Sequence, residues 1–221
     1  MQLDSRPASS YRLYSFIVSG LFLASLIIQK GQDVLWINGH HSTFQDQVFP
    51  LITDLGNGIV FMVILLATLF IRIQYTVATA LAWIGHGILV SIFKELLFSG
   101  LKRPRKVLDS SLLHFVPGVD VHRYNTFPSG HTATAFCVAL LVTLIFRKKI
   151  IGIIALLLAL LVAYSRIYLL QHFLMDVAAG AIIGCFTTYL VWEIIEAKQK
   201  PAWMQRRLRL PLRKEKTKIQ A

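Results

Sequence analysis

The sequence is poor in cysteine and in charge. Its two cysteines, Cys137 and Cys185, lie inside apolar runs in positions that suit neither a disulfide-bonded loop nor a metal site, so we expect buried thiols. Only 15% of the 221 residues are charged, whereas 55% are hydrophobic. Because the apolar runs are long enough to cross a bilayer, a soluble protein is disfavoured, and we expect a single membrane domain over residues 1–221.

Six apolar runs predict an all-α, polytopic membrane protein with six transmembrane helices in a bundle. The runs cover residues 13–28, 57–71, 76–98, 129–146, 150–170 and 172–195. The first run lacks the small-residue cleavage motif of a removable signal peptide, so we expect it to remain as a membrane helix. An even number of spans places both termini on the same side of the membrane.

The basic residues are distributed unequally between the two ends of the predicted helices. Fifteen of the 23 Lys and Arg residues lie at the termini and loops of one side, and nine of these follow Ala197. The positive-inside rule therefore predicts a cytoplasmic N-terminus (1–12) and a basic cytoplasmic tail (197–221). A net charge of +12 would suggest nucleic acid in a soluble protein, but here a tail lying against anionic lipid headgroups explains it better. We expect no nucleic-acid partner and no obligate protein partner.

Two groups of polar residues lie at the predicted outer ends of the third and fourth helices. Lys94 lies near the end of the third helix and Arg103 in the loop after it, so both could converge on one anion. Ser129 and Gly130 begin the fourth helix, where a hydroxyl and unhindered backbone amides suit a phosphate, and His131 lies beside them. Taken alone, each group also fits a solvated basic loop or an ordinary helix cap.

A third group, from Ser165 to Asp176, adds Arg166, His172 and Asp176. His172 and Asp176 are four residues apart and so share a helix face, where the carboxylate can orient the imidazole. A polar contact between helices would explain this pair equally well on its own. The three groups together favour a phosphate site, because they place three cations, two histidines and one acid near the outer helix ends.

The remaining histidines are expected to have ordinary roles. His40 and His41 are adjacent, do not share a helix face and lack a carboxylate or cysteine partner at metal-ligand spacing, so we interpret them as polar residues of the outer interface. His86 falls in the middle of the third span, where an ionisable group is costly, and we expect a neutral, hydrogen-bonded packing role. The loop 114–123 either roofs the pocket or is an ordinary surface loop.

In chain order the motifs K-x8-R-P, P-S-G-H and S-R-x5-H-x3-D resemble the type 2 phosphatidic acid phosphatase superfamily of membrane lipid phosphatases. The resemblance covers residues 94–176 directly, and the segment Asp54-Leu-Gly-Asn-Gly58 before the second helix also resembles the family. The family usually shows K-x6-R-P, whereas Arg103 lies two residues later. We expect the loop from Phe98 to Lys102 to absorb the extra residues, with Lys102 and Arg105 as substitutes for Arg103.

The resemblance implies a phosphatase that needs no metal and no other cofactor. His172 would attack phosphorus to form a phosphohistidine, Asp176 would orient its ring, and His131 would protonate the leaving oxygen and later activate water. The residues that would bind the substrate phosphate are Lys94, Arg103, Ser129, Gly130 and Arg166.

The resemblance also implies a substrate class and a location. The substrate would be a lipid phosphate or diphosphate: undecaprenyl diphosphate, phosphatidylglycerophosphate, phosphatidic acid or lipid A. The protein would lie in the bacterial cytoplasmic (inner) membrane with its active site facing the periplasm or the cell exterior. The alternative is a non-catalytic lipid-phosphate-binding or transport protein, which would not need a nucleophile, an orienting acid and a proton donor together. A vanadate haloperoxidase would be expected in a larger, soluble protein.

Overall fold

The computed structural model describes residues 6–197 and 200–208, and within these ranges all regular structure is helical. The α-helices are α1 (Arg6–Ile27), α2 (Gln32–Gly39), α3 (Thr43–Thr53), α4 (Gly58–Ile71), α5 (Ile73–Ser91), α6 (Pro104–Val107), α7 (Gly130–Phe146), α8 (Lys149–Tyr168) and α9 (Leu174–Ala197). Four further helical segments are the 3-10 turns η1 (Asp54–Gly56), η3 (Ser110–Leu112) and η4 (Ala202–Gln205), and the π-helix η2 (Ile92–Leu97). The expected all-α fold is confirmed, and each of the six apolar runs coincides with a helix.

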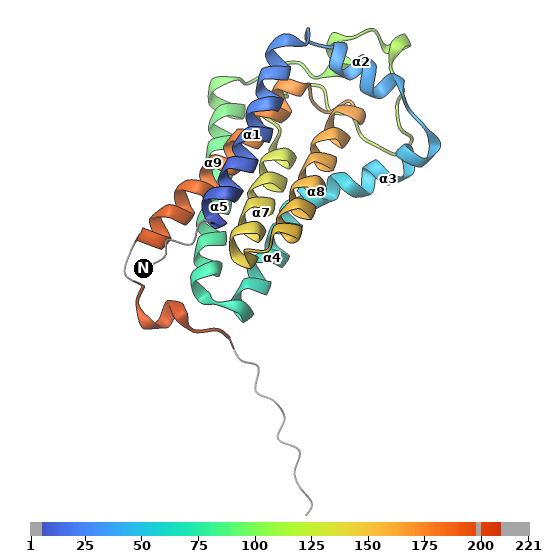
Figure 1. Ribbon diagram of the computed structural model, residues 1–221. Coiled ribbons are helices and arrows are strands. Elements are labelled where there is room, and N and C mark those ends of the chain that lie inside the picture. The colour runs from blue at the N-terminus through green and yellow to red at the C-terminus, as the bar shows by residue number, and fades with distance from the viewer. Residues whose placement is uncertain (1–5, 198–199, 209–221) are drawn as a thin grey trace, which may run out of the picture.

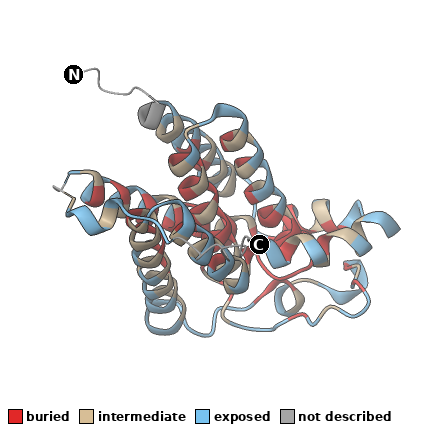
Figure 2. Ribbon diagram, turned by 90° about the horizontal axis from the view of Figure 1, so that it is seen from below, coloured by how far each residue is buried: buried red, intermediate tan, exposed pale blue. Residues whose placement is uncertain are grey.

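Helix α7 is the centre of the bundle (Figure 1). It packs most extensively against α8 and α9, and Figure 2 shows that buried residues gather towards the middle of the bundle. Small residues allow the close approach: a Cβ atom on Gly184 of α9 would overlap the backbone of Ala133, and one on Gly152 of α8 would lie 2.9 Å from the Thr143 side chain. The position of α7, and therefore of its N-terminus, is fixed by contacts on several sides.

Exposed large hydrophobic side chains cover the outside of the bundle. Examples are Leu23 and Ile27 on α1, Ile84 and Ile88 on α5, and Leu157 on α8. Such surfaces suit contact with lipid rather than water. The two cysteines are both unpaired, with Cys137 buried and Cys185 half-buried.

Four helices of the described chain are long and apolar enough to cross a membrane: residues 9–27 of α1, α5 with η2, α8, and α9. The pair formed by α3 with η1 and by α4 passes the same test but is bent by 52°. Helix α7 has 17 residues, which gives a length of about 25 Å against the roughly 30 Å of a hydrocarbon core. The structure thus has four candidate spans, or five with the bent pair, and the count of six stays a prediction because it also needs α7.

The two ends of the bundle differ. The start of α7, the end of α8, the start of α9 and α2 lie at one end, here called the site end, whereas α1 begins and α9 finishes at the opposite end (Figure 1). Of the expected basic tail, residues 200–208 fold back against the α4–α5 turn, where the Ile73 N–H donates to the Arg206 carbonyl at 2.9 Å. Residues 198–199 and 209–221 of that tail, and residues 1–5, lie outside the described part of the chain.

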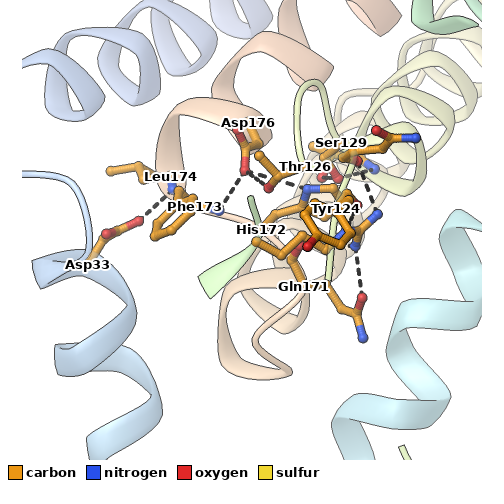
Figure 3. A network of polar contacts seen from close by, with 12 residues as sticks. Asp33, Tyr124, Thr126, Ser129, Gln171, His172, Phe173, Leu174 and Asp176 are labelled. Carbon is orange, nitrogen blue, oxygen red and sulfur yellow. Dashed lines mark hydrogen bonds and ion pairs between the residues drawn. The ribbon is translucent and has the colours of Figure 1, made fainter. Parts of the chain in front are cut away.

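The segment 31–56 contains α2, α3 and η1. The buried carboxylate of Asp33 in α2 accepts hydrogen bonds from the backbone N–H groups of Gly31, at 2.9 Å, and Leu174, at 2.5 Å. Leu174 is the first residue of α9. Helix α2 therefore fixes the point at which α9 starts, as Figure 3 shows.

Candidate active site

The turn between α8 and α9 places His172. Leu170 has a φ of 58°, an uncommon left-handed conformation for a residue with a side chain. Beyond it, the N–H groups of Gln171 and His172 both donate to the carbonyl oxygen of Arg166, at 3.0 and 3.2 Å. The chain thereby reverses direction and presents His172 two residues before α9 begins.

His172 and Asp176 face each other as expected, but His172 lies in the turn before α9, so the two residues do not share a helix face as predicted. The imidazole Nδ1 lies 3.6 Å from the Asp176 Oδ2, and both side chains are buried. Burial lowers the pKa of the His172 imidazole from its ordinary value of 6.5; the nearby Asp176 opposes this shift, and Arg166 and Arg103 add to it. The ring is therefore neutral near pH 7, and with Nδ1 towards the carboxylate its Nε2 is directed away from Asp176.

The carboxylate of Asp176 is held by more than the histidine (Figure 3). Its Oδ2 accepts hydrogen bonds from the Thr126 hydroxyl at 2.5 Å and from the Phe173 N–H at 2.8 Å. Its backbone carbonyl also accepts the Ser129 N–H at 2.9 Å, which joins the start of α9 to the start of α7. Sequence analysis missed Thr126, because no spacing rule relates it to Asp176, 50 residues later.

Arg103 is buried beside this turn, with most of its guanidinium donors engaged. Its Nε donates to the Tyr124 carbonyl at 2.7 Å, and its Nη2 donates to the Asn125 carbonyl at 3.2 Å. Its Nη1 donates to the backbone carbonyl and the side-chain oxygen of Gln171, at 3.0 and 2.8 Å. Since a guanidinium has five N–H groups, these contacts leave one for a substrate. Arg103 therefore clamps the segment before α7 onto the α8–α9 turn, a role the sequence did not indicate.

The lengthened spacing between Lys94 and Arg103 begins inside the helix. Lys94 lies in the π-helix η2, where the Phe98 N–H bonds to the Phe93 carbonyl five residues back, at 2.8 Å. The loop from Phe98 to Lys102 follows this wider helical turn, and its absorbing the extra residues stays a prediction. Lys94 still lies close enough to Arg103 and Arg166 to interact with them electrostatically.

The proposed substitutes do not take over the role of Arg103. Lys102 is exposed. The guanidinium of Arg105 lies over the Phe115 ring at 5.6 Å and reaches the Val121 carbonyl at 3.4 Å. Arg103 is the member of this basic cluster that is buried beside the α8–α9 turn.

The N-terminus of α7 lies beside the cations. Gly130 is its first residue, and a Cβ atom there would lie 4.0 Å from the Lys94 Nζ. Ser129 is the N-cap: its hydroxyl contacts the N–H and the hydroxyl of Thr132, at 3.4 and 2.9 Å, and is fully buried. The Ser129 side chain thus caps the helix, which leaves backbone N–H groups of the first turn as anion donors.

Arg166 has one unsatisfied donor. Its Nη1 donates to the Thr53 hydroxyl at 2.8 Å, but its buried Nε has no hydrogen-bond partner among the described residues. Such orphaned donors are rare in native proteins, and a buried guanidinium with a free N–H can donate it to an anion. The segment before α4 packs closely here, since a Cβ atom on Gly56 would lie 2.6 Å from the His131 carbonyl oxygen.

The other histidines have the ordinary contacts expected of them. His40 Nδ1 lies 2.6 Å from the Trp36 carbonyl, and the His41 ring stacks on His114 at 3.7 Å. His86 is hydrogen-bonded, as predicted, to the Ala82 carbonyl and the Thr134 hydroxyl. The described residues contain no group of three His, Cys, Asp or Glu side chains that could hold a metal ion.

The loop 114–123 lies against the site rather than free at the surface. The Gln171 side chain donates to the Asp120 carbonyl at 2.8 Å, and the Arg103 N–H donates to the Arg123 carbonyl at 3.0 Å. At its other end, the His114 ring contacts the Asp46 carboxylate at 2.9 Å. These contacts favour the interpretation of this loop as a roof.

The fold and the site together define the class of this protein. It is a helical bundle with an apolar outer surface, and one end of the bundle holds a buried histidine–aspartate pair surrounded by cations. The sequence profile of the PAP2 superfamily matches residues 73–200, more than half of the chain. The protein therefore belongs to the PAP2 superfamily, a phosphatase family.

Individual relatives agree with this assignment. Lipid A 4'-phosphatase of Bacteroides thetaiotaomicron is 29% identical over 174 residues, which are 74% of this chain and 75% of that protein. The crystal structure of Aquifex aeolicus LpxE matches with a TM-score of 0.65 and 28% identity, over 72% of this chain and 92% of that one. The transmembrane PAP2-type phosphatidylglycerolphosphate phosphatase from Bacillus subtilis shares the fold, with a TM-score of 0.59 and 24% identity over 89% of this chain and 98% of that one.

Proposed function

We propose that the protein is an integral membrane lipid phosphatase that transfers phosphate through a phosphohistidine on His172, without a metal ion. The observation that carries this proposal is the position of His172, buried and 3.6 Å from Asp176, beside the partly unsatisfied Arg166 guanidinium. A neutral imidazole with one nitrogen turned to a carboxylate has its other nitrogen available as a nucleophile. The cations would stabilise charge on the phosphoryl oxygens.

In the first step, Nε2 of His172 attacks phosphorus and forms a P–N bond while the bond to the leaving oxygen breaks. His131 donates a proton to that oxygen, which leaves as a lipid alcohol or, from a diphosphate, as a lipid phosphate. In the second step, His131 takes a proton from water, the water oxygen attacks phosphorus and the P–N bond breaks. Inorganic phosphate leaves, and both histidines return to their starting states.

The phosphate would be held through both steps by Lys94, by Arg166 and by the remaining N–H of Arg103. The first backbone amides of α7, including that of Gly130, would also bind it. Ser129 contributes through its cap, which fixes those amides. Asp176 would stabilise the positive charge that His172 gains on phosphorylation.

Four lipids remain candidate substrates: undecaprenyl diphosphate, phosphatidylglycerophosphate, phosphatidic acid and lipid A. A relative matched over three quarters of its length is a lipid A 4'-phosphatase, which favours a lipid phosphate over a soluble one. A site at the helix ends receives such a headgroup while its hydrocarbon stays in the bilayer.

The proposed topology has six spans, counting α7 and the bent α3–α4 pair, with both termini in the cytoplasm of a bacterium and the site facing outwards. The excess of basic residues at the end opposite the site supports this orientation. A cysteine introduced at Ser110 should react with a membrane-impermeant maleimide on intact spheroplasts, while a C-terminal reporter should be active only in the cytoplasm. Labelling of Ser110→Cys only after lysis would refute the orientation.

The function is tested with purified protein in detergent and excess EDTA, by measuring phosphate released from the four lipids. We expect turnover of at least one lipid by the wild type and none above background by His172→Ala and His131→Ala. Thr143→Val, at the far end of α7, is the matched control and should remain active. Full activity of His172→Ala, or loss of turnover on chelation, would contradict the mechanism. Tight lipid-phosphate binding without phosphate release would instead support the non-catalytic alternative.

A further inference from the structure

A cavity of about 270 Å³ lies beside His131, between α5, the η1–α4 junction and the start of α7. Gly130 and His131 line it at the site end, and Asn57, His86, Ser91 and Thr134 add polar groups to its walls. Val90 is the one aliphatic residue that the described chain contributes to this lining. A space intended only for hydrocarbon would have apolar walls, so the polarity of this cavity needs a reason.

The most unusual wall residue is His86, an ionisable group within an apolar helix. Its Nδ1 lies 2.9 Å from the Ala82 carbonyl, which can only accept, so Nδ1 carries the proton. In the neutral ring Nε2 is then an acceptor, and it lies 3.2 Å from the Thr134 hydroxyl. The bond joins α5 to α7, and both side chains are largely buried. Polar groups at such a depth are costly and commonly functional.

The position of this pair relates it to the substrate. Thr134 follows His131 by three residues and so lies on the same face of α7, about 4.5 Å further along the axis. Gly87 keeps the space beside His86 open, because a Cβ atom there would meet nothing within 4 Å. His131 lines the cavity, so for a phosphate held beside His131 the cavity is an adjoining space for the atoms that follow the phosphate ester oxygen.

We propose that the His86–Thr134 pair selects lipids whose phosphate is attached to an oxygen-bearing group, and this rests on the proposed phosphatase function. That group is a glycerol with a free hydroxyl or with ester carbonyls, or an acylated sugar with hydroxyl and amide groups. The Ser91 hydroxyl can donate to a carbonyl oxygen, and the Thr134 oxygen, whose proton points to Nε2 of His86, can accept a hydrogen bond from a hydroxyl. A prenyl alcohol offers only hydrocarbon at the same depth and gains none of these hydrogen bonds.

The size of the preference follows from the state of the pair without ligand. His86 and Thr134 satisfy each other, so hydrocarbon in the cavity does not leave an orphaned group, and a polar ligand adds hydrogen bonds without breaking the pair. Each net hydrogen bond then changes kcat/KM by about 3- to 10-fold rather than by several orders of magnitude.

The test compares kcat and KM for phosphatidylglycerophosphate, lipid A and undecaprenyl phosphate in one detergent. Thr134→Val and His86→Phe keep size and remove polarity. We expect each to raise KM for the first two substrates about 3- to 10-fold, with kcat and all values for undecaprenyl phosphate unchanged within twofold. Thr134→Ser, which keeps the hydroxyl, should behave as the wild type.

Thr79→Val is the matched control. Thr79 is fully buried on the same helix as His86, bonds to the Tyr75 carbonyl at 2.7 Å and lies outside the cavity lining, so its substitution should change neither class of substrate.

Three outcomes would overturn the proposal. A wild-type preference for undecaprenyl phosphate, or equal losses on all substrates in Thr134→Val and His86→Phe, would show that the pair only ties α5 to α7. Absence of turnover by the wild type on every lipid would refute the proposed function and the preference with it.

Discussion

Replacing Thr126 by valine removes one hydrogen bond from the group that orients the proposed nucleophile. The Thr126 hydroxyl donates to Asp176 Oδ2 at 2.5 Å, and both residues are buried. A hydrogen bond to a charged group contributes about 1.5–3 kcal/mol, and 1.36 kcal/mol corresponds to a tenfold change in rate. The Phe173 N–H still holds the same oxygen, at 2.8 Å, so Asp176 stays in place but is less well fixed. We expect kcat to fall about 10- to 100-fold with KM within a factor of about two.

The assay is steady-state phosphate release from the best substrate of the panel, together with a thermal unfolding curve in detergent. Thr126→Ser keeps the hydroxyl and should recover most of the lost kcat. Thr143→Val removes an equally buried hydroxyl, bonded to Tyr14 at the far end of α7, and should leave kcat unchanged. A folded Thr126→Val variant with wild-type kcat, or a serine variant no better than valine, would refute the role of the Thr126 hydroxyl in fixing Asp176.

Three further predictions follow from the site. Arg103→Lys should lower kcat/KM about 100-fold, because an ammonium cannot reproduce the fork that bonds Tyr124, Asn125 and Gln171; activity within twofold of wild type would contradict this. Gly56→Ala should lower kcat/KM at least about tenfold and lower the Tm, since its Cβ atom would lie 2.6 Å from the His131 carbonyl. Gly39→Ala is the control: a Cβ atom at Gly39 would meet no atom within 4 Å, so neither kcat/KM nor the Tm should change. Burial lowers the pKa of His172, so its ring gains a proton only below pH 6.5 and stays a competent nucleophile above that pH. Histidine NMR, with His172→Ala used to assign the signal, should place the titration of His172 below pH 6.5. A titration at or above pH 6.5 would be inconsistent with the site.

Much of the fold follows from the sequence because a bilayer demands long apolar helices. The six apolar runs located α1, α4, α5, α7, α8 and α9, and the sequence paired His172 with Asp176, although the pair forms across the turn before α9 and not on a helix face. These features depend on local pattern alone. The sequence also placed the start of the fourth helix at Ser129 and Gly130, and α7 begins at Gly130 with Ser129 as its N-cap.

Features that depend on distant contacts were not predictable in the same way. The π-helix at Lys94 and the bend between α3 and α4 are departures from a regular helix that no hydropathy pattern marks. Arg103 was expected to bind an anion with a free fork, but the carbonyl groups that occupy it belong to residues 124, 125 and 171. Thr126 and Asp33 were missed because their partners, Asp176 and the start of α9, are far away in the chain.

The central claim is that phosphate passes through His172, and single-turnover labelling tests it most directly. Protein in excess over a lipid with a radiolabelled phosphate is quenched in alkali, which preserves phosphohistidine, and the labelled peptide is identified by mass spectrometry. We predict a transient label on His172 that appears before free phosphate and is absent in His172→Ala. Release of phosphate with no labelled intermediate, or a label on any other residue, would contradict the account.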